Sequence, residues 1–465
     1  MALFESDGSS LDSKKMKMRL EMQSLSSTEN AKNRAVSGSN SSDVRKLKIG
    51  LIGFGTVGRS VARILCSEPR GPLVLTHICN RNIDKKKVDS LPADIRWTAN
   101  ADEVLSSSVD VIVELIGGME PAGEWIRSAL AAGKSVVTAN KLLISERGAE
   151  LMELARKMQR RIEFGASVAG GIPAIVGIQE GLAGDRLCKI SGILNGTCNY
   201  ILTQMEAHGA SFEAALREAQ QLGYAEADPT SDIEGYDARA KLTILTAAGL
   251  HVQVRNEQIP CRPISLIEAV DFAYVRDLNC TIRQISCAQK EISDKLRLFA
   301  AVQPALVPLS SLTAHAEGSK NMVTTTGEFS GKMIFSGYGA GGDPTAVAVV
   351  SDLYSIARGG NATQAHIQAA MEIPGLVSGD FTVPHYIRFV VKDRPGIVAA
   401  IAEVLAKHGI SLDAVLQKPG YLRARLPFVM TLEACSSSVL SRALEEISGL
   451  DFHVQEPLCL PIFED

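Results

Sequence analysis

Short apolar runs alternate with stretches of helical spacing from residue 45 onward. Each apolar run is bounded by glycine or polar residues and predicts a buried strand; the strands are 47–54, 73–79, 109–115 and 135–138. Helices are predicted at 58–66 and 122–132. Strands that alternate with helices form βαβ units, so the pattern predicts an α/β fold with a parallel sheet over residues 45–165.

Two further regions follow this first one. Residues 166–380 combine longer helices with strands of their own, which is typical of an α+β domain. Residues 384–465 read as β-α-β-β-α-β, the order of a ferredoxin-like domain. Its strands are predicted at 385–391, 410–416, 426–431 and 452–455, and its helices at 396–408 and 437–447.

Residues 1–44 differ from the rest of the chain. They include 11 serines, show no apolar periodicity and mix charges of both signs. They also lack the apolar segment of a secretory signal, and their acidic residues argue against a transit peptide. We therefore predict a disordered tail that takes no part in the fold.

Composition narrows the class of protein. A net charge of -4 gives no electrostatic footprint for nucleic acid. No apolar run reaches the roughly 18 residues that a membrane span requires, so no membrane partner is expected. The 9 cysteines show no CxxC spacing, which in a chain of 465 residues indicates reduced thiols and a cytoplasmic location.

The first predicted strand runs into a G-x-G-x-x-G pattern at Gly53, Gly55 and Gly58. Gly53 allows a tight turn, Gly55 lets the backbone approach a pyrophosphate, and Gly58 lets the helix pack against the strand. The N-terminus of that helix offers unpaired N–H groups to phosphates. In this context the pattern predicts a Rossmann-type dinucleotide site; alone, it would also fit a plain strand–turn–helix.

The residues after the second strand bear on the choice of nicotinamide cofactor. An NAD site usually places an acidic residue about 20 positions beyond the glycines, where it binds the ribose 2′-hydroxyl. Here Arg81 stands in that region, with Lys85, Lys86 and Lys87 close behind and no carboxylate before Asp84. Because a cation can bind a 2′-phosphate, Arg81 favours NADP over NAD, which remains the alternative. The three lysines by themselves would also fit a run of solvated surface residues.

Lys141 follows the strand predicted at 135–138. In an open α/β sheet the carboxyl ends of the strands face the ligand crevice. Lys141 is therefore expected to point toward the nicotinamide or the substrate. The alternative is a surface lysine that opens a helix.

Residues 223–241 contain the densest group of ionisable side chains in the chain, including the acids Glu226, Asp228 and Asp232. A helix predicted from about residue 236 places Asp237 and Lys241 four positions apart on one face. Such a pair is most often a surface salt bridge. Beside further carboxylates, it predicts a site where acids hold a substrate ammonium group and Lys241 exchanges a proton with a reacting oxygen.

Two glycine-rich segments, 166–173 and 193–200, predict turns. The carbonyl groups of the first could line a pocket for a cation or substrate, and the N–H groups of the second could receive a substrate carboxylate. Either segment equally fits a structural turn. Cys198 has no histidine near it in sequence before His208, so we favour a buried thiol over a nucleophile.

Six segments together resemble the homoserine dehydrogenase family: GFGTVG, VVTANK, ASVAGGIP, GILNGTCNYILT, GYAEADPTSDIEGYDARAKL and GYGAGGDPTA. They occur in that family's order and spacing over about residues 45–355. The resemblance implies an NAD(P)-dependent enzyme of threonine and methionine biosynthesis. Its reaction would be the reversible reduction of aspartate 4-semialdehyde to homoserine.

The resemblance also implies roles for single residues. Lys241 matches the catalytic lysine, Glu226 and Asp237 match substrate-holding acids, and Lys141 matches a lysine near cofactor and substrate. We therefore assign catalysis to Lys241 and Asp237, and substrate binding to Glu226, Asp232 and Lys141. Cofactor contacts are expected from Gly53, Phe54, Gly55, Thr56, Val57, Gly58, Arg81, Lys141 and Gly341. We also expect residues 340–365 to complete the first domain.

The family further implies a sodium ion near the 166–173 turn, bound largely by backbone carbonyls. The matching positions are Gly165, Val168, Gly170 and Ile172. The family commonly has glutamate where this chain has Gly165. Because the expected ligands are backbone carbonyls, this difference in side chain does not exclude the ion.

The sequence 393–397 (DRPGI) follows a strand and resembles ACT domains, which bind amino acids. Threonine is the effector that a threonine pathway would favour; the alternative is a dimerisation module without a ligand. A homodimer or homotetramer is expected, and no aspartokinase-like domain precedes the glycine pattern.

Two other functions compete with this interpretation. A phosphorylating aspartate-semialdehyde dehydrogenase would need a catalytic Cys–His pair, which the sequence does not offer. A sensor without catalysis would have lost the lysine and acids of residues 223–241, which this chain retains.

Overall fold

The computed structural model describes residues 46–67, 71–86, 90–292, 295–359 and 374–463. The tail predicted at 1–44 lies outside these residues, as do residues 360–365. Within the described residues, no helix is both long and apolar enough to cross a membrane. The elements below belong to one compact unit, Leu47–Asp465.

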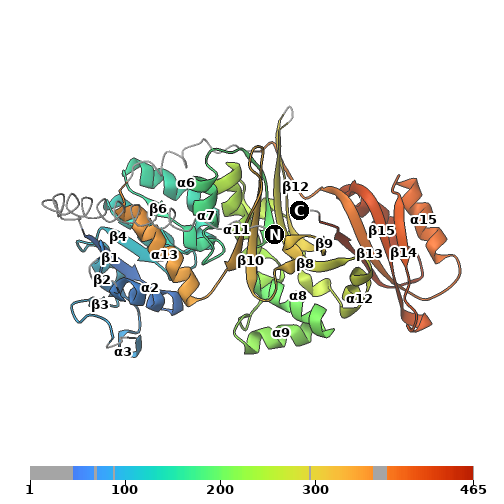
Figure 1. Cartoon of the computed structure of the whole chain (residues 1–465), viewed down its shortest axis with the longest axis horizontal. Coiled ribbons are helices and arrows are strands. Elements are labelled where there is room, and N and C mark those ends of the chain that lie inside the picture. Colours follow the sequence, from blue (N-terminus) through green and yellow to red (C-terminus); the bar gives the residue numbers. More distant parts are fainter. Residues whose placement is uncertain (1–45, 68–70, 87–89, 293–294, 360–373, 464–465) are drawn as a thin grey trace, which may run out of the picture. The chain divides into compact units, whose positions relative to one another are not determined.

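The first sheet has six parallel strands in the order β3-β2-β1-β4-β5-β6 (Figure 1). They are β1 (Leu47–Ile52), β2 (Leu73–Cys79), β3 (Arg96–Thr98), β4 (Val111–Glu114), β5 (Ser135–Thr138) and β6 (Ile162–Glu163). The helices are α2 (Thr56–Ser67), α3 (Ile83–Lys86), α4 (Ala101–Leu105), α5 (Ala122–Ala131) and α6 (Lys141–Lys157). This order is that of a Rossmann-type sheet, whose ligand crevice lies where the strand order reverses, between β1 and β4.

The predicted strands and helices of this region are confirmed, with small shifts at their ends. The first strand stops at Ile52 because Gly53 takes a φ of +105°, outside the extended region. β3 and β6 were not predicted. They have 3 and 2 residues, too few to show an apolar pattern.

Helices cover both faces of this sheet because the interior positions of its central strands are mainly apolar. Val111 and Val113 of β4 pack in a cluster with α2 and α13 (Gly342–Ala357), whereas Ile112 packs in the cluster that includes α5 and α6. The side chains of Val111, Ile112 and Val113 are all fully buried.

α13 returns from late in the chain and packs against α2. Asp343 in its first turn accepts hydrogen bonds from Ser60 Oγ at 2.6 Å and from Arg63 Nη2 at 2.6 Å. The start of α13 is thereby fixed beside the helix that follows the glycine pattern.

The second sheet has the order β11-β10-β7-β8-β9-β12, antiparallel except for the β9–β12 pair. Its strands are β7 (Leu187–Ile193), β8 (Cys280–Ile292), β9 (Leu296–Pro308), β10 (Lys320–Gly327), β11 (Gly331–Tyr338) and β12 (Leu376–Ser378). Its helices are α7 (Ala174–Val176), α8 (Gly196–His208), α9 (Phe212–Gln221), α10 (Thr230–Ile233), α11 (Tyr236–Leu245) and α12 (Ala269–Asp277). Because α8, α11 and α12 all contact β8, this region is α+β, as expected.

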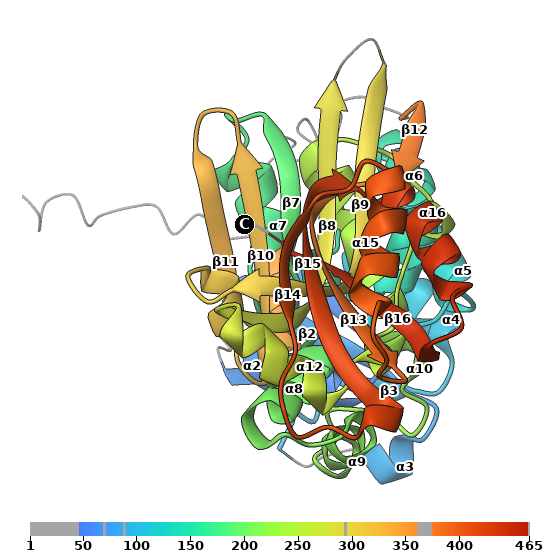
Figure 2. The same ribbon diagram turned by 90° about the vertical axis from the view of Figure 1, so that its right-hand side faces the viewer.

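The third sheet is antiparallel, with the order β14-β15-β13-β16. Its elements are β13 (Thr382–Val391), α15 (Ile397–Lys407), β14 (Leu412–Leu416), β15 (Leu426–Ser436), α16 (Ser437–Ser448) and β16 (His453–Pro461). This is the predicted ferredoxin-like β-α-β-β-α-β order. Figure 2 shows α15 and α16 side by side over one face of the sheet.

A buried ion pair joins the other face of the third sheet to α12. Arg388 Nη1 lies 2.7 Å from Asp271 Oδ2, and the Tyr386 hydroxyl donates to Asp271 Oδ1 at 2.8 Å. Burial raises the pKa of Asp271 to about 6, although the Arg388 charge opposes this rise. The third sheet is thus held on the second region by polar as well as apolar contacts.

Candidate active site

The glycine turn after β1 has the close contacts that the sequence predicted. A Cβ added at Gly58 would lie 2.1 Å from the Gly53 carbonyl oxygen, and one at Gly53 would lie 2.8 Å from the Leu115 carbonyl carbon. A Cβ at Gly55 would meet open space, as expected where a backbone faces a ligand. Helix α2 begins at Thr56, so its first N–H groups point out of this turn.

Phe54 and its neighbours play different parts in this turn. The Phe54 side chain is 1% exposed and packs edge-on against Trp97 with ring centroids 4.9 Å apart. Its backbone N–H donates to Asn80 Oδ1 at 3.3 Å. A cofactor could therefore reach Phe54 only through its backbone, whereas Thr56 is exposed and Val57 half-buried at the start of α2.

Arg81 and Gly341 come to the same end of the first sheet by different routes. Arg81 is exposed, two residues beyond the end of β2, the strand next to β1. Gly341 caps α13, and a Cβ added at the next residue, Gly342, would lie 2.9 Å from Thr56 Cγ2.

The ends of β4 and β5 are tied together by residues that the sequence analysis missed. Glu114 is fully buried and accepts a hydrogen bond from Thr138 Oγ1 at 2.6 Å and others from the N–H groups of Ile116 and Gly117. Asn140 caps α6 by accepting from the Leu143 N–H at 3.2 Å. A buried polar side chain that ends an apolar strand is the signal that would have indicated them.

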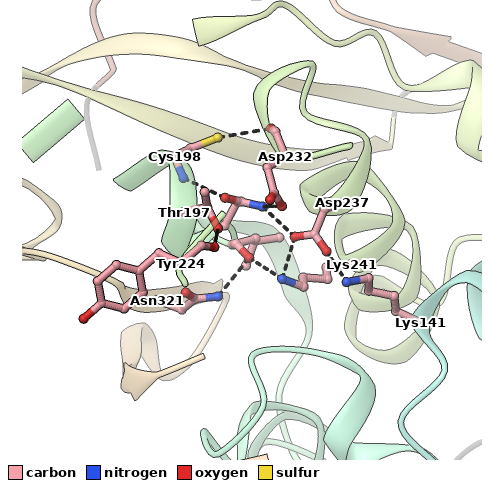
Figure 3. A network of polar contacts seen from close by, with 10 residues as sticks. Lys141, Thr197, Cys198, Tyr224, Asp232, Asp237, Lys241 and Asn321 are labelled. Atoms are coloured by element: carbon pink, nitrogen blue, oxygen red, sulfur yellow. Dashed lines mark hydrogen bonds and ion pairs between the residues drawn. The ribbon is translucent and has the colours of Figure 1, made fainter. Parts of the chain in front are cut away.

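Asp237 is the centre of the second group of residues, and its two carboxylate oxygens hold two lysines (Figure 3). Lys241 Nζ donates to Asp237 Oδ2 at 2.7 Å and to the Leu194 carbonyl at 2.8 Å. Lys141 Nζ forms an ion pair with Asp237 Oδ1. Asp237 and Lys241 are buried, whereas 44% of the Lys141 side chain is exposed. The carboxylate thus joins the start of α6, in the first region, to α11, in the second.

Asn195 brings a further acid to this group. Its side-chain N–H₂ donates to Asp237 Oδ2 at 2.8 Å and to Asp232 Oδ1 at 2.7 Å. Its side-chain oxygen accepts from the Cys198 N–H at 2.8 Å and caps α8. The 193–200 segment is therefore a helix cap whose asparagine also orients two acids. The sequence analysis left open a structural turn or a contact of its N–H groups with a substrate carboxylate, and it did not anticipate this role for Asn195.

The charges of these groups depend on one another. Burial alone would raise the pKa of Asp237, but Lys241 and Lys141 hold it below the ordinary value. Burial would lower the pKa of Lys141, but Asp237, Asp232 and Glu226 raise it. Burial raises the pKa of Asp232, and the charge of Asp237 adds to that rise. Asp237 is therefore the fixed anion of the group, and Asp232 is the acid more readily protonated.

The remaining acids and the thiol have distinct surroundings. Glu226 is exposed, and its charge acts on Lys141. Asp228, which was expected to join the acids around the lysine, instead accepts from Thr230 N and Oγ1 at the start of α10. Cys198 is fully buried, its Sγ donates to the Asp232 carbonyl at 3.1 Å, and burial raises its pKa. These surroundings confirm a buried thiol over a nucleophile.

The turn expected to bind sodium lies beside a buried acid of α13. A Cβ added at Gly165 would be 2.7 Å from Asp352 Oδ1, so a larger residue there would require the Asp352 carboxylate to shift. Burial and the Glu163 charge raise the pKa of Asp352, while N–H groups of Gly165 and Ala166 donate to it. Asp352 Oδ2 is buried without a hydrogen-bond partner among the described residues. An unsatisfied buried oxygen at this place is compatible with a nearby cation.

Family models match three parts of the chain. One described as the NAD binding domain of homoserine dehydrogenase matches residues 53–165, one described as homoserine dehydrogenase matches 173–354, and an ACT domain matches 385–452. The homoserine dehydrogenase of Mycobacterium tuberculosis is 36% identical over 425 residues, which cover 88% of this chain and 96% of that protein. The chain belongs to the homoserine dehydrogenase family. It is therefore an NAD(P)-dependent oxidoreductase of amino-acid biosynthesis.

Other members of the homoserine dehydrogenase family agree in sequence and fold. The enzyme of Corynebacterium glutamicum is 38% identical, with 85% of this chain and 91% of that protein covered. The crystal structure of a homoserine dehydrogenase from Thiobacillus denitrificans superposes with a TM-score of 0.81 at 33% identity, covering 90% and 98% of the two chains. A hyperthermophilic archaeal homoserine dehydrogenase in complex with NADPH has a TM-score of 0.56 at 27% identity, covering 67% and 97%.

Proposed function

We propose that this chain catalyses the reversible reduction of L-aspartate 4-semialdehyde to L-homoserine with NADPH. The observation that carries the proposal is the pair of lysines on one buried carboxylate, Asp237, with Lys141 from the nucleotide-binding region and Lys241 from the second region. A substrate between these regions would meet cations, acids and the cofactor end of the first sheet together.

Lys241 is the residue to which we assign proton transfer. Two N–H groups of its ammonium donate to Asp237 and to the Leu194 carbonyl. The third is the donor we assign to the substrate oxygen, because an ammonium group has three. When bound, the nicotinamide cofactor supplies the hydride. In reduction Lys241 Nζ gives a proton to the aldehyde oxygen, and in oxidation it takes the hydroxyl proton back.

The acids and Lys141 are assigned to binding the amino-acid part of the substrate. Asp232 and Glu226 offer carboxylates to its ammonium group, and Lys141 offers a cation at the side of the cofactor. Asn195 supports this arrangement, since it holds Asp232 and Asp237 through one amide.

The proposal is tested in the direction of reduction. Purified full-length protein, supplied with aspartate 4-semialdehyde and NADPH, should form homoserine in amounts equal to the NADPH consumed. In a parallel assay with the aldehyde, phosphate and NADP, a phosphorylating aldehyde dehydrogenase would instead form an acyl phosphate. That product, together with no homoserine in the NADPH assay, would refute the proposal.

We propose NADP as the preferred cofactor, and Arg81 as the residue that selects it. We expect Arg81→Ala to raise the KM for NADP about ten- to a hundredfold, because it removes a charge-assisted bond to the 2′-phosphate. The KM for NAD, which lacks that phosphate, should stay unchanged and serves as the internal control. Steady-state kinetics with both cofactors measure this; an equal rise for both would show that Arg81 does not read the 2′-phosphate.

We also propose a sodium ion, held by the backbone carbonyls of Gly165, Val168, Gly170 and Ile172. The buried, unpartnered Asp352 oxygen beside Gly165 supports it. A ligand that binds only the folded state raises its stability. The thermal unfolding midpoint should therefore be higher in sodium chloride than in choline chloride at equal ionic strength, and equal midpoints would contradict the site.

Threonine feedback through the ACT domain is the regulation we propose, in a cytoplasmic homodimer or homotetramer. Its support is the ACT match at 385–452 and the buried Arg388–Asp271 pair, through which the ACT sheet contacts α12. Threonine should lower the rate of homoserine formation by full-length protein, and an unchanged rate would exclude this effector.

A further inference from the structure

A cavity of about 530 Å³ lies between the second region and the ACT domain, away from the catalytic lysines. One wall comes from the segment around Arg262 and from β9; the other comes from β13, α16 and the linker residue Asp380. Ser437 and Ser441 add hydroxyl groups from α16. We call this cavity the interdomain cleft.

The interdomain cleft carries one group of each charge. Arg262 is half-buried and donates from Nη1 to the Cys459 carbonyl at 2.9 Å. Asp380 accepts hydrogen bonds from Ser436 Oγ at 2.7 Å and from the Ser438 N–H at 2.8 Å. Burial would raise the pKa of Asp380, but these bonds keep it below the ordinary value. Burial and the Arg262 charge lower the pKa of His385 to about 4, so that ring is neutral at pH 7. Among the lining residues the fixed charges are therefore the Arg262 cation and the Asp380 anion, and the charge of Arg442 on α16 also acts on Asp380.

The segment that carries Arg262 also touches the start of the catalytic helix. Arg262 N–H donates to the Val302 carbonyl at 2.9 Å, and a Cβ added at Gly235 would lie 3.0 Å from Val302 Cγ1. The neighbouring Cys261 donates from Sγ to the Gly235 carbonyl at 3.7 Å. Gly235 immediately precedes α11, whose first turn contains Asp237. A shift of the Arg262 segment would therefore act directly on the helix that holds the two lysines.

We propose that the interdomain cleft is the binding site of a small L-α-amino acid, with its carboxylate on Arg262 and its ammonium group on Asp380. The ligand would change activity through the contact of residues 261 and 302 with Gly235. This site is distinct from the DRPGI segment at 393–397: the cleft lies at the first residues of β13, and that segment follows its last residue. The inference rests on the proposed regulation and assigns it a place.

Calorimetric titration of the full-length protein with each standard L-amino acid, L-threonine first, tests the site. We expect Arg262→Gln to weaken binding at least about tenfold, since it removes a charge-assisted bond. Arg394→Gln is the matched control, because Arg394 lies in the DRPGI segment and pairs there with Asp451, which comes from later in the chain. The affinity of this variant for the amino acid should stay within about twofold of that of the wild type. The amide and the N-acetyl derivative of the amino acid, each lacking one charge, should both bind more weakly.

Ser441→Trp separates the site from a folding defect in Arg262→Gln. Ser441 is exposed on α16, so a tryptophan there would fill the cleft without replacing a buried group; it should also abolish binding while thermal unfolding stays cooperative. The proposal is overturned if both variants bind as the wild type does, if Arg394→Gln alone abolishes binding, or if no amino acid binds. Binding is measured without turnover, so a protein that binds an amino acid here but does not form homoserine would refute the proposed reaction and leave this site standing.

Discussion

We expect Lys241→Ala to lower kcat for homoserine oxidation by about a thousandfold, because general acid–base groups contribute about 10²–10⁴-fold. The lysine is buried and held by Asp237 and the Leu194 carbonyl, so its ammonium has one defined position. Alanine cannot exchange the hydroxyl proton, and water in its place would be poorly oriented. The loss corresponds to about 4 kcal/mol of transition-state stabilisation.

Two measurements separate this loss from general damage. The affinity for NADPH, followed by the fluorescence of the bound cofactor, should be unchanged, because Lys241 lies on α11 and the glycine turn lies on the first sheet. Lys157→Ala removes an exposed lysine of α6 that pairs with Glu153 and should keep the wild-type kcat. Wild-type turnover by Lys241→Ala would refute the assigned role of the lysine.

The second large effect is expected at Asp237. Asp237→Asn should lower kcat/KM at least about a hundredfold and destabilise the fold by about 3–5 kcal/mol at pH 7, as when a buried ion pair loses one partner. The carboxylate is 5% exposed and pairs with two lysines, so its replacement removes the one anion that contacts both ammonium groups. Chemical denaturation monitored by circular dichroism measures the stability change.

The pH dependence of this effect has a defined sign. The folded-state pKa of Asp237 lies below its ordinary value, so its charge stabilises the fold above pH of about 4, the pKa of an unfolded aspartate. That stabilisation is lost as the pH falls further, through the folded-state pKa. The stability difference between wild type and Asp237→Asn should therefore be full at pH 7 and shrink below pH of about 4.

Asp228→Asn is the matched control for Asp237. Asp228 is an exposed acid of the same segment. Within the described residues, its side chain accepts hydrogen bonds from Thr230 N and Oγ1. Its replacement should change kcat/KM little. If Asp228→Asn and Asp237→Asn had equal effects, the segment would act through its total charge, and the two-lysine arrangement at Asp237 would not explain activity.

Patterns that are local in sequence gave the correct elements of the fold. The runs of β4 and β5 are buried at every position and that of β1 over its last four residues, and a strand buried on both faces needs a mainly apolar run. The spacing of Asp237 and Lys241 likewise placed both on one helical face, because helix geometry alone decides which residues four apart can meet.

Contacts between distant segments could not be predicted in this way. Asn195 joins Asp232 and Asp237 only because α8 and α11 pack on the same sheet, and Lys141 reaches Asp237 from another region of the chain. The inward turn of Phe54 and the local bonds of Asp228 depend on neighbours that spacing does not specify. These pairings follow from tertiary packing, which a single sequence does not show.

The most direct measurement is the oxidation of L-homoserine by the full-length protein with NADP, followed by the absorbance of the reduced cofactor and by analysis of the product. The two-lysine site predicts that NADPH and aspartate 4-semialdehyde form in equal amounts, and that the rate falls about a thousandfold in Lys241→Ala. Absence of NADPH or NADH formation from homoserine, or equal rates in wild type and Lys241→Ala, would contradict it.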